Sequence, residues 1–328
     1  MNMQKMAPVG YGVLLLALLA APFLGVYPIF VMKLLCFALF AVAFNLLLGY
    51  TGLLSFGHAA FLGGAAYICG YAIKDVGATP EIGLLAGTAS GALLGLVMGW
   101  FTIRRQGIYA TMITLALAQM LFFACLQAPF TGGEDGLQGV PRGKLFGLLD
   151  LQSDLVMYYV TVVIATAAFL LIVRTIHSPF GQVLKGIKEN EARATSLGYD
   201  TNRFKLLAFV ISAAIAGLAG SLVTLVLGFA TLSDVHWSMS GHVVLMTLVG
   251  GMGTLSGPLV GAVVVVALEN KIGDLGAWLA RTTGVEWFST LGQSVTIVTG
   301  LIFIVCVLAF RRGIMGELIA WLQGRGKS

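Results

Sequence analysis

The chain has 328 residues, of which 58% are hydrophobic and only 10% are charged, and its mean hydropathy is +0.95. A membrane span needs about 20 mostly apolar residues, and this composition is typical of proteins with several such spans. The formal net charge of +5 is therefore not a sign of nucleic-acid binding. In a membrane protein it is interpreted loop by loop, because Lys and Arg concentrate on the cytoplasmic side.

The apolar runs predict an all-α bundle of transmembrane helices that forms one domain over residues 1–328. Residues 1–26 resemble a secretory signal peptide, with one lysine, an apolar run and small residues near Ala20. We favour a first span, because further spans follow almost at once. The predicted spans are 10–30, 33–49, 53–73, 82–101, 108–127, 155–173, 205–229, a broken one at 243–270, and 291–310.

The basic residues predict the orientation. All but six of the 19 Lys and Arg residues fall on one side of the membrane if the amino terminus is cytoplasmic. The six on the opposite side are Lys33, Lys74, Arg142, Lys144, Lys271 and Arg281. We therefore expect a multi-pass protein of the cell inner membrane with both termini in the cytoplasm.

The predicted number of spans decides how residues 243–270 cross the membrane. Since the span 205–229 leaves the cytoplasm, a single crossing at 243–270 would put the basic carboxyl tail outside. The tail stays inside only if this stretch enters the membrane and returns on the same face. Its centre, from Gly250 to Pro258, breaks a helix both by glycine flexibility and by a missing amide. Non-helical backbone at membrane depth needs protein or a water-filled cavity around it. We predict a pair of short or half-spanning segments packed in the interior, with an ordinary kinked span as the alternative.

The longest charge-rich run is the predicted cytoplasmic loop 174–205. Ser178 followed by Pro179 is a helix start, because proline at the first position gives up an amide that has no partner. The apolar spacing from Phe180 predicts a short amphipathic helix that ends at Leu197, and Gly198 is placed to stop it. Asp200 or Thr201 can then cap a second helix that enters an apolar span. The loop is either a solvated connection or a docking surface for a partner.

A row of glycines runs through the fourth predicted span with a spacing of four residues. Such a row follows one helix face and lets a second backbone approach closely, as in small-xxx-small packing. We interpret it as a packing surface and not as a chemical site. Its members are Gly83, Gly87, Gly91, Gly95 and Gly99.

The sequence shows few groups that could carry chemistry. It has no phosphate loop, no metal-binding spacing and no carboxylate pair within an apolar run, and its four cysteines are predicted to be free and buried. Intramembrane charges usually mark proton- or sodium-driven transporters, so their absence argues against that class. Polar residues among glycines suit a substrate path or a tight helix crossing, and His58 alone could be a structural histidine. These candidate path residues are Asn45, Thr51, Ser55 and His58.

Three segments of the chain, in this order, carry a resemblance to a known family. They are NLLLGYTGLLSFGHAAFLGGAAY (45–67), SPFGQVLKGIKENEARATSLGYDTNRFKLLAFVISAAIAGLAGSL (178–222) and GGMGTLSGPLVGA (250–262). From about Ala41 to Arg312 the chain resembles the inner-membrane permeases of branched-chain amino acid ABC importers, specifically the LivM-type subunit.

The resemblance implies partners and an energy source outside this chain. It implies a heterodimer with a second homologous permease chain, two ABC ATPase subunits that use ATP and Mg, and an external substrate-binding protein. It also implies that this chain is not an enzyme, binds no cofactor or metal, and contacts the ATPases through a cytoplasmic helix with an EAA-like segment, which here reads ENEARA. The coupling residues are then expected to be Lys188, Glu189, Asn190, Glu191, Arg193, Leu197 and Gly198.

The leading functional hypothesis is a permease subunit that translocates leucine, isoleucine and valine. A sibling permease for urea, short amides or other amino acids has the same signatures. A stand-alone channel or secondary transporter is a more distant alternative, and it would need no ATPase. A membrane enzyme is less well supported, because no nucleophile–base or metal constellation is visible.

Overall fold

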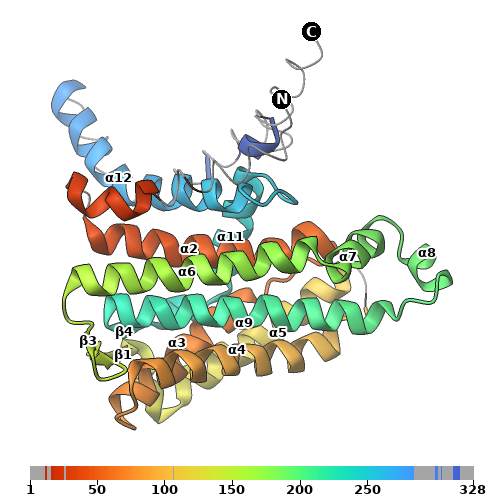
Figure 1. The fold of residues 1–328 in the computed structure, drawn as a ribbon, viewed down its shortest axis with the longest axis horizontal. Helices are drawn as coiled ribbons and strands as arrows, with labels where there is room; N and C mark the ends of the chain where they lie inside the picture. The colour runs from red at the N-terminus through yellow and green to blue at the C-terminus, as the bar shows by residue number, and fades with distance from the viewer. Residues whose placement is uncertain are drawn as a thin grey trace.

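The computed structural model describes residue 12 and residues 16–25, 27–105, 107–283, 300, 301, 304 and 313–317. The described residues form an all-α bundle, as the apolar pattern predicts (Figure 1). Most of the predicted span 291–310 lies outside the described residues. The five helices long and apolar enough to cross a membrane within the described part are Pro28–Thr51, Pro80–Thr102, Ile108–Gln127, Asp154–His177 and Thr201–Leu227.

The first helices begin and end at different places from those predicted. Within the expected span 10–30, residues 21–24 form a short 3-10 helix, η1 (Ala21–Leu24), which ends where Gly25 takes the left-handed conformation with φ 77°. Helix α2 (Pro28–Asn45) starts at its proline, five residues before the predicted position 33, and continues as a π-helix, η2 (Leu46–Thr51). Proline suits this position because its missing N–H would have no helical partner. Helix α3 (His58–Lys74) begins five residues later than predicted, since residues 52–57 are not helical.

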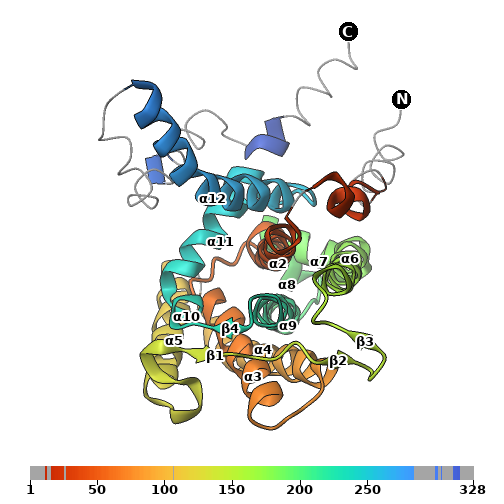
Figure 2. The same cartoon turned by 90° about the vertical axis from the view of Figure 1, so that its left-hand side faces the viewer.

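The later helices follow the apolar runs closely. Helix α4 (Pro80–Thr102), α5 (Ile108–Gln127), α6 (Asp154–His177) and α9 (Thr201–Leu227) each start within four residues of the predicted span. Helix α9 lies at the centre of the bundle, where it packs against α2, α3 and α4 (Figure 2). Seventeen of its residues are buried, many of them small, which allows three neighbours to approach it closely.

The predicted break within 243–270 is present. Helix α11 (Trp237–Gly250) follows the one-turn helix α10 (Leu232–Val235) and stops at Gly251, and α12 (Gly257–Thr283) begins six residues later. The two helices pack directly on each other. A Cβ atom on Gly261 would overlap the carbonyl oxygen of Met246, so this contact requires glycine. The chain therefore turns back on itself at residues 251–256, which we call the interior turn.

One end of the bundle carries small β-ladders that the sequence did not predict. Strand β1 (Leu137–Gln138) pairs antiparallel with β4 (Phe229–Ala230), and β2 (Lys144–Leu145) pairs with β3 (Leu149–Asp150). Helices α7 (Pro179–Glu189) and α8 (Glu191–Ser196) lie at the other end (Figure 1). We call these ends the β1 end and the α7 end.

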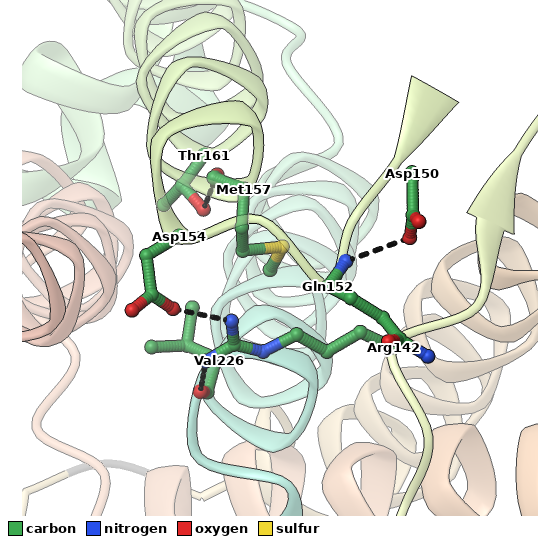
Figure 3. Close-up of polar contacts among 7 residues, drawn as sticks. All are labelled: Arg142, Asp150, Gln152, Asp154, Met157, Thr161 and Val226. Carbon is green, nitrogen blue, oxygen red and sulfur yellow. Dashed lines mark hydrogen bonds and ion pairs between the residues drawn. The ribbon is translucent and has the colours of Figure 1, made fainter. Parts of the chain in front are cut away.

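Arg142 fastens the loop at the β1 end to two helices (Figure 3). Its Nη1 lies 2.6 Å from Oδ1 of Asp154 in the first turn of α6, and its Nη2 donates to the carbonyl oxygen of Val226, 2.8 Å away, in the last turn of α9. The last carbonyls of a helix have no intrahelical partner and carry partial negative charge. A guanidinium there donates the missing hydrogen bond and also places a positive charge next to the partial negative one. The loop is thus held where α6 begins and α9 ends.

Candidate functional site

The α7 end presents two short helices in place of the single predicted helix 180–197. Ser178 caps α7 by accepting a hydrogen bond from the amide of Gly181, 3.4 Å away, and α7 buries Gly181, Leu184 and Ile187 against the bundle. Asn190 then leaves helical geometry, with φ −158° and ψ 99°, and its Oδ1 accepts from the amide of Arg193 at 2.9 Å. Asparagine favours this role because its side chain competes with the helical backbone. The predicted helix is therefore split at Asn190.

The caps that follow α8 match the prediction. Gly198 has φ 89°, a left-handed conformation that favours glycine, and it follows the last turn of α8. Asp200 caps α9 by accepting from the amide of Arg203 at 3.2 Å. These caps hold α7 and α8 at a fixed place beside the first turn of α9.

A groove of about 610 Å³ lies between α7 and α8. Among its lining residues are four of the seven expected coupling residues. Those four are Glu189, Asn190, Arg193 and Leu197. Leu197 is 71% exposed. The Arg193 side chain forms no ion pair with any carboxylate in the described residues. The groove thus combines an exposed leucine with an arginine, Arg193, that has no ion pair within the described residues.

Glu191 and Lys188 contact the bundle and do not line this groove. Oε1 of Glu191 lies 2.5 Å from Nζ of Lys205, whose side chain is only 4% exposed. Nζ of Lys188 donates to the carbonyl oxygen of Gly49 in η2 at 2.7 Å. The sequence does not indicate these contacts with the bundle, and the predicted contact of both residues with an ATPase subunit stays a prediction.

The four candidate path residues are all buried within this chain. Asn45 donates through Nδ2 to the carbonyl oxygen of Thr254 at 2.9 Å and accepts through Oδ1 from the amide of Gly253 at 2.9 Å. The hydroxyl of Thr51 bonds to the carbonyl of Leu47, and Oγ of Ser55 accepts from the amide of Gly57 at 3.2 Å. The polar side-chain groups of Asn45, Thr51 and Ser55 are therefore used inside the fold, and the place of the four residues on a substrate path stays a prediction.

His58 occupies an aromatic box. Its Nε2 lies 2.9 Å from Oγ of Ser212, which in turn donates to the carbonyl of Ala43 at 2.5 Å. The rings of Phe44 and Phe61 stand edge-on to the imidazole, with centroids 4.9 and 5.2 Å away. This arrangement joins α2, α3 and α9, and it is typical of a hydrogen-bonded structural histidine.

The five glycines of α4 are all buried, and their neighbours come from α3 and α9. A Cβ atom on Gly91 would lie 2.8 Å from the carbonyl oxygen of Ala213 and 3.0 Å from Cα of Gly217. A Cβ atom on Gly87 would overlap the hydroxyl of Ser221. The row therefore sets the distance between the backbones of α4 and α9. Within the described residues, no group of three His, Cys, Asp or Glu side chains could hold a metal ion.

The bundle, with five described helices long and apolar enough to cross a membrane, is the architecture of a multi-pass membrane protein. Residues 29–309 match the family model described as branched-chain amino acid transport system, permease component. The chain belongs to this family, which confirms the resemblance identified from its three segments. No solved structure matches the chain significantly.

Curated relatives cover several import systems. The high-affinity branched-chain amino acid transport permease LivM of Escherichia coli is 26% identical over 74% of this chain and 62% of its own length. The ribose import permease RbsC of Haemophilus influenzae is 24% identical over 58% of each chain. The autoinducer 2 import permease LsrC of Salmonella choleraesuis is 27% identical over 58% of this chain and 53% of its own length. The chain thus spans less than two thirds of the length of these relatives.

Proposed function

We propose that this chain is the membrane-spanning permease subunit of an ATP-driven importer for branched-chain amino acids. The observation that carries the proposal is the α7–α8 groove, a capped and amphipathic surface at one end of a transmembrane bundle. It supplies a place for ATPase subunits to act on the membrane helices, and the chain itself has no phosphate loop. Membership of the permease family and the likeness to LivM support the same assignment.

The remaining parts of the importer are separate chains in this proposal. A second homologous permease completes the passage, two ATPase subunits dock at the α7 end on the cytoplasmic side, and an external binding protein delivers the amino acid at the β1 end. Residues Glu189, Arg193 and Leu197 contact the ATPase, because they line the groove. Motion of the docked helices then changes the side to which the passage opens.

Docking can be tested by photo-crosslinking from single cysteines that carry a benzophenone label. We expect Leu197→Cys to form an adduct with an ATPase subunit in native membranes. Leu148→Cys is the matched control, since Leu148 is 87% exposed and lies between β2 and β3 at the other end. Adducts from position 148 with none from position 197 would place the ATPase on the wrong end for this proposal.

The substrate can be tested by uptake of labelled leucine in cells that lack the chain, with and without its restoration. We expect restored uptake that unlabelled isoleucine and valine block and that urea and alanine leave unchanged. The ribose and autoinducer 2 permeases among the relatives make other solutes the natural comparison. If the chain restored uptake of ribose or urea and not of leucine, the proposal of an importer permease would stand and the proposed branched-chain substrate would be wrong.

A further inference from the structure

Lys188 connects α7 to the end of the second helix. Its ammonium donates to the carbonyl oxygen of Gly49 at 2.7 Å, and its side-chain stem lies over Gly52, where an added Cβ atom would be 3.2 Å from Cγ of Lys188. Gly49 is in the last turn of η2, where carbonyl groups lack helical partners and carry partial negative charge. The ring of Tyr50 lies 5.7 Å from Nζ of Lys185 and forms a second contact between α7 and η2.

Asn45 connects the same helix to the interior turn. It is 2% exposed, and both hydrogen bonds of its side-chain amide go to backbone atoms of that turn, the amide of Gly253 and the carbonyl of Thr254. Gly49 allows the approach, because a Cβ atom there would lie 2.7 Å from the nitrogen of Gly253. The end of α2–η2 is therefore bonded to α7 on one side and to the interior turn on the other.

Both segments at this junction lack regular helical structure. Residues 52–57 separate η2 from α3, and residues 251–256 separate α11 from α12. Gly52, Gly251 and Gly253 have positive φ values of 74°, 117° and 78°. Such turns can change conformation without breaking a helical hydrogen-bond ladder, so they are the places where a helical bundle bends most easily.

We propose that Lys188 and Asn45 form a mechanical link that carries the displacement of α7 to residues 52–57 and 251–256, which act together as the gate at the α7 end. The inference rests on the proposed function, because a docked ATPase is what displaces α7. Lys188 is a positioning residue in this view: it acts through backbone contacts and touches no substrate. Figure 1 shows α7 beside the end of the bundle that such a gate would close.

The test measures uptake and ATP hydrolysis together in proteoliposomes that contain the complete transporter. We expect Lys188→Met, which keeps the stem and removes the ammonium, to lower uptake per ATP hydrolysed about tenfold, the factor that corresponds to losing one charge-assisted hydrogen bond. Lys188→Arg should restore most of the coupling. Lys74→Met is the matched control, because Nζ of Lys74 makes the same type of bond to the carbonyl of Gln138 at the β1 end.

A second measurement follows the gate directly. Met252 is 54% exposed in the interior turn, so a single cysteine there, in a variant without the four native cysteines, reports on access. We expect ATP to change its rate of maleimide modification, and Lys188→Met to abolish that change. Unaltered coupling and an unaltered ATP effect in Lys188→Met would overturn the link alone. Absence of ATP-dependent uptake with the unmodified chain would instead overturn the proposed function, and this inference with it.

Discussion

Lys205 is a charged side chain that the protein keeps almost entirely away from solvent. Its only ion pair with a described carboxylate is the one with Glu191, at 2.5 Å, which ties α8 to the first turn of α9. Removing one partner of a buried pair leaves an uncompensated charge, whereas removing both can be nearly neutral. The pair therefore has a structural role that must be separated from any role in docking.

We predict that Glu191→Gln lowers the free energy of unfolding by about 2 kcal/mol, less than for a fully buried pair because the Glu191 side chain is 28% exposed. The double variant Glu191→Gln with Lys205→Met should regain most of this loss. Thermal unfolding of the purified chain in detergent measures both effects. Equal stability of the single variant and the unmodified chain would show that the ion pair contributes nothing.

Arg193 provides the complementary variant for docking. Its side chain lines the groove and has no ion pair within the described residues, so Arg193→Glu should leave thermal stability unchanged. We expect the same variant to uncouple ATP hydrolysis from uptake, since it reverses a charge at the proposed contact. Normal coupling in Arg193→Glu would remove this residue from the docking surface.

Long-range contacts were the part that the sequence could not predict. Asn45 and His58 were predicted to lie on a substrate path, which stays a prediction, and the structure adds that Asn45 bonds to the interior turn and His58 to Ser212. Their partners lie more than 150 positions away along the chain, and no local pattern indicates such contacts. By contrast, Ser178 is a helix cap as predicted, and of the two predicted alternatives Asp200 and Thr201 the cap is Asp200, because capping depends on residues only three positions apart.

At the scale of elements, the packing of α4 on α9 depends on the absence of side chains. We predict that Gly91→Ala destabilises the protein markedly, because the new methyl group would lie 2.8 Å from the carbonyl of Ala213 and neither backbone can move freely. Ala89→Leu is the control, since Ala89 is exposed on the same helix. Yield and thermal stability in detergent distinguish the two. An unaffected Gly91→Ala protein would contradict the close approach.

Helix positions were predicted well where an apolar run is bounded by a helix-breaking residue such as glycine. The predicted boundaries 108–127 coincide with those of α5, and the predicted break near Gly251 is present. The prediction failed where apolar sequence continues through a change of backbone geometry. Residues 46–57 read as two ordinary spans, but they contain a π-helix followed by non-helical backbone, which hydrophobicity alone does not distinguish from an α-helix.

For the whole molecule, the two ends differ in the charges that they carry. Arg104 and Arg105 follow α4 at the α7 end, where Lys188 and Arg193 also lie, whereas Lys74 bonds to β1 at the other end. The excess of basic residues near the α7 end predicts that this end is cytoplasmic. The two orientations differ in which surface residues an external reagent can reach.

We predict that a membrane-impermeant maleimide added to intact cells modifies Leu148→Cys and leaves Leu197→Cys unmodified. Both positions are well exposed, at 87% and 71%, so accessibility within the chain does not bias the comparison. In permeabilised cells that lack the ATPase subunits, both positions should react. Modification of position 197 in intact cells would reverse the proposed orientation.

The pairing of β1 with β4 has a consequence for biosynthesis. The two strands come from opposite sides of the α6–α9 segment, so their hydrogen bonds cannot form until α9 has been synthesised and has crossed the membrane. The contacts of Arg142 are likewise incomplete until α9 has formed, because one of its partners is the carbonyl of Val226 (Figure 3). A ribosome-bound chain that stops before residue 226 would therefore leave the loop at the β1 end unfastened and open to proteases, and a longer chain would acquire protection in one late step.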